Sequence, residues 1–203
     1  MRIKICGLFR NEDIDYVNEA RPDYAGFVFA KSRRQVSTVL AQHLRFRLAD
    51  EIVPVGVFVN APVAEVAALY QNGTISIAQL HGGEDEGYIS RLKKMCPADG
   101  KRPSIRIIKV INGDDLKNGI PQTTADYYLV DSGAGTGKSF DWRRLNSIKF
   151  EKPWFLAGGI DIKNIAQAAA LNPFAVDISS GAETDGIKDR EKILQLITII
   201  RKT

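Results

Sequence analysis

The sequence predicts an α/β protein, a single (β/α)8 TIM barrel with parallel strands that occupies residues 1–203. Two observations predict it. Eight short apolar runs alternate with helical patterns along the chain, and polar or glycine residues repeatedly follow the apolar runs. Alternation of strands and helices produces parallel strands, and eight repeats in about 200 residues suit a closed barrel.

The strand-like runs are rich in Val, Ile, Leu and Phe. In chain order they are Ile3–Cys6, Ala25–Phe29, Val53–Val59, Ile75–His81, Ile105–Val110, Tyr127–Asp131, Trp154–Ala157 and Ala175–Ile178. Helical patterns between them predict helices over Glu12–Glu19, Ser37–Leu48, Pro62–Tyr70, Ile162–Leu171 and Asp189–Ile200. Helices after the fifth and sixth runs have weaker signals.

An open doubly wound sheet also alternates strands with helices. That fold would need a G-x-G-x-x-G motif after an early strand and an acidic residue further on. The first strand is followed by the single Gly7. The barrel is therefore favoured.

Composition and charge restrict the classes of protein to which the chain can belong. With 44% hydrophobic residues, the 203-residue chain can form one packed core, and no apolar run approaches the roughly 20 residues of a membrane span. The N-terminus lacks the apolar stretch of a signal peptide, and Cys6 and Cys96 form no metal-type pair, so a cytoplasmic protein is expected. The net charge of +4 comes from scattered basic residues, which favours a small anionic substrate over nucleic acid.

The stretch VDSGAGTGKSF, Val130–Phe140, superficially resembles an ATPase phosphate loop. In the pattern G-x-x-x-x-G-K-[ST] the first glycine would fall at Ser132, so the register fails. The segment after Phe140 is also too short for the long helix that a phosphate loop opens. We instead expect the loop containing Gly135 and Gly137 to cover a bound phosphate ester.

The polar residues that interrupt the apolar pattern fall where barrel active sites lie, at the C-terminal ends of strands. A lone cysteine is usually a core residue, and a strand-end histidine is usually structural, so the shared location carries the prediction. Phosphate sites in such barrels use backbone N–H groups after strands seven and eight. The residues expected at the site are Cys6, Arg34, His81, Asp131, Gly158, Gly159, Asp177, Ser180 and Gly181.

Lys4 precedes Cys6 by two residues and is therefore expected to face the barrel interior as well. A buried lysine needs a partner, and Asp177 lies on the neighbouring eighth strand. We predict an ion pair beneath the site that favours the Cys6 thiolate. The alternative is a purely structural Lys4 bound to another carboxylate or to a backbone carbonyl.

Several motifs together resemble the phosphoribosylanthranilate isomerase family of tryptophan biosynthesis. The resemblance runs in order through KICG at Lys4–Gly7, GFVF with SRR within Gly26–Arg34, GVFVN at Gly56–Asn60, QLHG at Gln79–Gly82, GTGKSFDW at Gly135–Trp142, LAGGI at Leu156–Ile160, DISSGAE at Asp177–Glu183 and GIKD at Gly186–Asp189. It implies an Amadori rearrangement of an aminoaldose phosphate to an aminoketose phosphate, with no cofactor and no metal. It also implies a small phosphorylated substrate, no nucleic-acid or membrane partner, and a monomer or homodimer.

The resemblance implies a role for each central residue. Cys6 would be the general base at C2′ of the ribose, Asp131 the general acid at the ring oxygen, and Arg34 the contact for the anthranilate carboxylate. The thiol needs cationic surroundings because its ordinary pKa is about 8.5, and Asp131 must be protonated. Ser32 departs from the proline or lysine familiar in this loop, which leaves Arg33 as a candidate; the spacing to Val36-Ser37 favours Arg34.

Three other functions are less consistent with the sequence. Indoleglycerol phosphate synthase needs a longer N-terminal segment and a lysine acid. The histidine-pathway isomerase uses two aspartates, whereas strand one here ends in Cys6. A catalytically inactive barrel would be expected to lack one of Cys6, Arg34 and Asp131, all of which are present.

Overall fold

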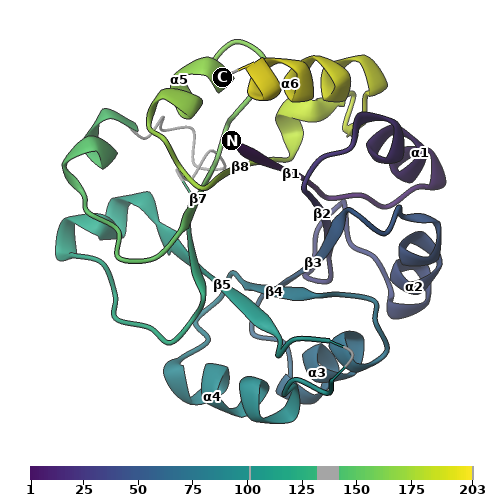
Figure 1. Ribbon diagram of the computed structural model, residues 1–203, viewed down its shortest axis with the longest axis vertical. Helices are drawn as coiled ribbons and strands as arrows, with labels where there is room; N and C mark the ends of the chain where they lie inside the picture. The colour runs from purple at the N-terminus through teal and green to yellow at the C-terminus, as the bar shows by residue number, and fades with distance from the viewer. Residues whose placement is uncertain (101, 132–141, 203) are drawn as a thin grey trace.

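The chain folds into a closed parallel barrel, as predicted. The structure, a computed structural model, describes residues 1–100, 102–131 and 142–202. Within these residues eight strands pair in chain order from β1 to β8, and β8 closes on β1 (Figure 1). The strands are β1 (Arg2–Cys6), β2 (Tyr24–Val28), β3 (Val53–Phe58), β4 (Ile77–Leu80), β5 (Arg106–Asn112), β6 (Tyr127–Asp131), β7 (Trp154–Ala157) and β8 (Ala175–Ile178).

The helices form an outer ring around the strands (Figure 1). They are α1 (Asn11–Ala20), α2 (Thr38–Arg47), α3 (Val63–Gln71), α4 (Glu86–Met95), α5 (Ile165–Ala170) and α6 (Arg190–Lys202). Short 3-10 helices η1 (Gly113–Asn118) and η2 (Trp142–Ser147) follow β5 and β6, where the helical signal is weak. Among the described residues, no helix combines the length and the apolar character needed to cross a membrane.

The five predicted helices are present, with ends shifted by one to three residues. Ser37 is the N-cap of α2 rather than its first residue, because its hydroxyl accepts a hydrogen bond from the Leu40 N–H at 3.1 Å. The sequence interpretation missed α4. Asp85 caps this helix, and its apolar face is short, with Tyr88, Ile89 and Leu92 buried.

Apolar side chains from β2 to β8 pack together inside the barrel. Phe155 packs edge-on against Tyr24 and Tyr127, with ring centroids 5.4 and 5.7 Å apart. Such packing makes a barrel interior a core rather than a pore. The full cluster is Tyr24, Val55, Ile77, Ile108, Tyr127, Leu129, Phe155, Ala157 and Ala175.

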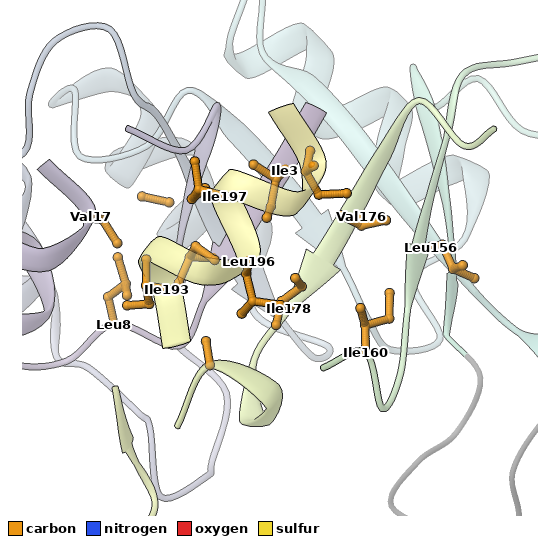
Figure 2. Packing of buried hydrophobic residues seen from close by; sticks show 14 of the residues in the cluster. Ile3, Leu8, Val17, Leu156, Ile160, Val176, Ile178, Ile193, Leu196 and Ile197 are labelled. Atoms are coloured by element: carbon orange, nitrogen blue, oxygen red, sulfur yellow. The ribbon is translucent and has the colours of Figure 1, made fainter. Parts of the chain in front are cut away.

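Helix α6 covers the outer face of β1 and β8. In Figure 2, Leu196 of α6 lies beside Ile178 of β8. Ile193 and Ile197 of α6 belong to the same buried cluster as Ile3 of β1. Each buried aliphatic side chain contributes about 1.5–3 kcal/mol. This packing fixes the two strands that carry Cys6 and Asp177.

After β8 the chain forms a feature that the sequence interpretation missed. The 3-10 helix η3 (Ser180–Ala182) leads into a small antiparallel hairpin of β9 (Glu183–Thr184) and β10 (Ile187–Lys188). In its register Lys188 lies opposite Glu183. The hairpin therefore places two buried charged residues beside the end of the barrel.

Candidate active site

A cavity of about 510 Å³ opens at the C-terminal end of the barrel. The predicted site residues that line it are Cys6, Arg34, His81, Asp131, Gly158, Gly159, Asp177 and Ser180. Gly181 is not among the lining residues, and Gly135 and Gly137 lie outside the described residues. Residues far apart in the sequence thus converge on one cavity.

Cys6 ends β1 and is 7% exposed. Gly26 on the adjacent strand gives the thiol room, since a Cβ there would lie 2.7 Å from the sulfur. Burial raises the pKa of Cys6 above its ordinary value, while Lys4 lowers this pKa and Asp177 raises it. Lys4 thus acts on the thiol in the predicted direction, although desolvation by burial has the larger effect on its pKa.

The predicted buried ion pair between Lys4 and Asp177 is confirmed. The Lys4 Nζ lies 2.8 Å from Asp177 Oδ2, and the lysine is fully buried. The ammonium also donates to Gln79 Oε1 at 2.9 Å, a contact that was not predicted. Burial alone would lower the pKa of Lys4, but attraction to Asp177 and Cys6 raises it, so the ammonium stays charged.

The other oxygen of Asp177 is a candidate ligand contact. Oδ1 is buried and accepts no hydrogen bond within the described part of the chain. A buried acceptor without a donor is costly, and Asp177 lines the cavity. A donor group on a bound molecule could therefore satisfy it.

His81 and Asp131 meet at the rim of the cavity. His81 Nε2 lies 3.3 Å from Asp131 Oδ2, and the two side chains are 37% and 28% exposed. Asp131 ends β6, which is separated from β1 and Cys6 by β7 and β8. The carboxyl group and the thiol consequently approach the cavity from different sides.

The structure distinguishes the two arginines that the sequence left open. The Arg34 side chain is 19% exposed and lines the cavity, whereas the Arg33 side chain is 57% exposed and is not among the lining residues. Both are bound by Glu183, through contacts of 2.6 Å to Arg33 and of 2.6 and 2.8 Å to Arg34. Glu183 is the last residue of the DISSGAE motif. The sequence alone does not predict its role, because a sequence pattern does not show which side chains an acidic residue contacts.

The glycines after β7 and β8 occupy backbone positions that disfavour a side chain. Gly158 and Gly159 have φ angles of +94° and +66°, a region that side chains disfavour. A Cβ on Gly181 would lie 1.9 Å from the Ile160 carbonyl oxygen, so this glycine permits the two loops to approach. Phosphate binding by this backbone stays a prediction.

The described residues contain no group of three His, Cys, Asp or Glu side chains placed to hold a metal ion. What the cavity does offer is a thiol, a carboxyl group near an imidazole, a guanidinium and glycine-rich backbone. These groups can donate and accept protons and can bind anions.

Comparisons with known proteins identify the family and agree with the fold. Residues 3–198 match the family described as N-(5′-phosphoribosyl)anthranilate isomerase. An N-(5′-phosphoribosyl)anthranilate isomerase of Endomicrobium trichonymphae is 45% identical over 206 residues, which cover 98% of each chain. The crystal structure of a phosphoribosyl anthranilate isomerase from Thermus thermophilus has a TM-score of 0.81 at 28% identity and covers 100% of this chain and 99% of its own.

A further solved isomerase structure contains a ligand. It is a phosphoribosyl anthranilate isomerase in complex with reduced 1-(o-carboxyphenylamino)-1-deoxyribulose 5-phosphate. It has a TM-score of 0.80 at 27% identity, with complete coverage of both chains. The likeness therefore extends over the whole barrel.

Proposed function

The chain belongs to the N-(5′-phosphoribosyl)anthranilate isomerase family of tryptophan biosynthesis, and on this premise we propose how its residues carry out the isomerisation. The substrate is N-(5′-phosphoribosyl)anthranilate and the product is 1-(2-carboxyphenylamino)-1-deoxyribulose 5-phosphate. The observation that carries the proposal is the convergence of Cys6, Asp131 and Arg34 on one cavity. We also propose a cytoplasmic location, in keeping with two free thiols.

Asp131 is the general acid of the first step. It gives a proton to the furanose ring oxygen while the bond between that oxygen and C1′ breaks. The anthranilate nitrogen supplies the electron pair, and a protonated Schiff base forms. His81, 3.3 Å away, holds the carboxyl group at the rim. Proton donation of this kind typically accelerates a step by about 10²–10⁴-fold.

Cys6 is the general base of the second step. It removes the proton from C2′, and the electrons of that bond neutralise the iminium to give an enolamine. Cys6 then returns this proton to C1′ while the C2′ hydroxyl loses its own proton and becomes the ketone. The proton from the hydroxyl restores the acid form of Asp131, so that no atom is gained or lost. Burial raises the pKa of the free thiol, and the positive charge of the Schiff base assists ionisation when it forms. The thiol is thereby activated mainly when the proton must be removed.

The remaining groups orient the substrate. Arg34 binds the anthranilate carboxylate, for which a planar guanidinium is suited. Asp177 Oδ1, which has no partner in the described residues, accepts a hydrogen bond from a ribose hydroxyl. The backbone at Gly158, Gly159 and the segment from Ser180 to Gly181 binds the phosphate.

The activity is tested by fluorescence. Phosphoribosylanthranilate is generated in situ, and the purified chain should accelerate the decay of its fluorescence above the spontaneous rate. Asp131→Asn is the matched control, because it keeps the size of the side chain and removes the acidic proton. If the wild-type chain does not increase the rate of fluorescence decay, this function is excluded.

A further inference from the structure

Glu183 lies at the centre of a cluster of three cations. Its carboxylate accepts hydrogen bonds from three side chains. The donors are Arg34 Nε at 2.6 Å, Arg34 Nη2 at 2.8 Å, Arg33 Nη2 at 2.6 Å and Lys188 Nζ at 2.6 Å. Glu183 and Lys188 are buried, at 7% and 2% exposure. One carboxylate thus fixes charged groups from the loop after β2 and from the β9–β10 hairpin.

The hairpin that carries this carboxylate is itself anchored to the site. The Lys188 ammonium donates to the Ser179 carbonyl at 3.1 Å, and the Ser179 hydroxyl donates to the Cys6 carbonyl at 3.1 Å. Glu183 is therefore held in a fixed position relative to β1 and β8. A side chain held in this way can act as a rigid support for Arg34.

The orientation of Arg34 follows from which of its donors are occupied. A guanidinium has five N–H donors arranged in a plane. Glu183 occupies the edge formed by Nε and Nη2. Within the part of the chain that the structure describes, the end formed by the other Nη2 hydrogen and by Nη1 has no hydrogen-bond acceptor, so it can bind a second planar anion. Arg34 also lines the cavity.

Two glycines make room for the arginines around Glu183. Gly7 has a φ of +83°, and a Cβ on it would lie 2.3 Å from Arg34 Cδ. Gly186 has a φ of +84°, and a Cβ on it would lie 2.3 Å from Arg33 Nη1. The backbone is thus shaped around both guanidinium groups, which indicates that their positions are specified.

From this geometry we propose that Glu183 is a positioning residue that directs one end of the Arg34 guanidinium toward the aryl carboxylate of the ligand. The inference rests on the proposed function, because it takes Arg34 as the carboxylate contact. Glu183 does not touch the ligand. It sets specificity by presenting Arg34 in a single orientation, which favours ligands with a carboxylate over those without one.

The charge state of the cluster is consistent with this role. Burial would raise the pKa of Glu183, but hydrogen bonds from Arg34 and Lys188 lower it below its ordinary 4.5. The carboxylate is therefore ionised at neutral pH. Three cations and one anion also leave a net positive charge beside the cavity, which attracts the anionic ligand.

The test compares two ligands by calorimetry. One is reduced 1-(o-carboxyphenylamino)-1-deoxyribulose 5-phosphate, and the other is the same compound without the aryl carboxylate. The wild-type chain should prefer the first by at least about tenfold, since hydrogen bonds to charged groups have that magnitude. Glu183→Gln should reduce this preference about tenfold while affinity for the second ligand is unchanged. A merely structural role would weaken both ligands equally.

Arg33→Gln is the matched control, because Arg33 contacts the same Glu183 oxygen but is not among the cavity-lining residues. It should leave the preference for the carboxylate-bearing ligand intact.

If Glu183→Gln does not fold, the same two affinities are measured for Glu183→Asp. A reduced preference in that variant supports the proposal, and an unchanged preference overturns it. A wild-type chain without any preference would remove the Arg34 assignment and the inference with it. A preference lost in Arg34→Ala but kept in Glu183→Gln would overturn the inference alone.

Discussion

Lys4 and Asp177 form a buried ion pair next to Cys6. The Nζ–Oδ2 distance is 2.8 Å, and the side chains are 0% and 7% exposed. The lysine raises the acidity of the thiol, while Asp177 partly opposes it. The pair thus connects the stability of the barrel interior with the reactivity of the site.

Lys4→Met should destabilise the protein by roughly 3–5 kcal/mol, because it leaves Asp177 as a buried charge without its partner. It should also raise the pKa of Cys6 further, since Lys4 lowers that pKa in the wild type. Urea unfolding measures the first effect. The rate of thiol alkylation against pH, in a Cys96→Ser background, measures the second.

The exposed Lys163 provides the control for the loss of a lysine, and Lys163→Met should change neither quantity measurably. A Lys4→Met protein with wild-type stability and an unchanged thiol pKa would show that the pair neither supports the fold nor activates the cysteine.

Cys6→Ser should lower turnover about 10²–10⁴-fold while affinity for the reduced product analogue stays near normal, because a hydroxyl is a far weaker base than a thiolate. Burial raises the pKa of Cys6. In the wild type, kcat/KM should accordingly rise with pH through the neutral range, and this rise should vanish in the variant. A loss of less than about tenfold in turnover would place the base elsewhere.

Arg34→Lys should weaken substrate binding by about tenfold, whereas Arg33→Lys should have little effect. The structure supplies the reason, since only Arg34 of the two is among the cavity-lining residues. KM and the affinity for the product analogue are the quantities to measure. Equal behaviour of the two variants would mean that both arginines attract the anion from a distance only.

Strand order and most helices were predictable because the apolar runs and the helical patterns are local in the sequence. The pairing of Lys4 with Asp177 was predictable too, since strand periodicity and barrel closure fix which residues face each other. Helix α4 was missed because its apolar face comprises few residues, and its N-cap, Asp85, was overlooked as a helix signal.

The cluster around Glu183 was not predictable from pattern. The hairpin strands β9 and β10 have two residues each, too few to produce periodicity. Its two arginine partners come from positions about 150 residues earlier, so only the folded chain brings them to Glu183. The raised pKa of Cys6 was not predictable for a related reason, because sequence shows nearby charge but not the extent of burial.

Glu183→Gln should make the protein less sensitive to acid. The pKa of Glu183 is lowered in the folded state, so its charge stabilises the fold above the ordinary pKa of 4.5. This contribution is lost as the pH falls through the folded-state pKa. Urea unfolding at several values between pH 7 and about pH 3 should show a smaller loss of stability for the variant than for the wild type. Parallel curves would mean that Glu183 has the same pKa folded and unfolded.

Gly7→Ala should both destabilise the protein and weaken binding. Its φ of +83° is unfavourable for alanine by about 1–2 kcal/mol, and the added Cβ would lie 2.3 Å from Arg34 Cδ, which forces the arginine to move. Gly73→Ala is the matched control, with a φ of +82° and Arg102 Nη1 as its nearest neighbour at 4.0 Å. Both variants should therefore lose stability from backbone strain, as urea unfolding can measure. Only Gly7→Ala should also raise KM, because only there does the methyl group displace the guanidinium from its place between Glu183 and the cavity.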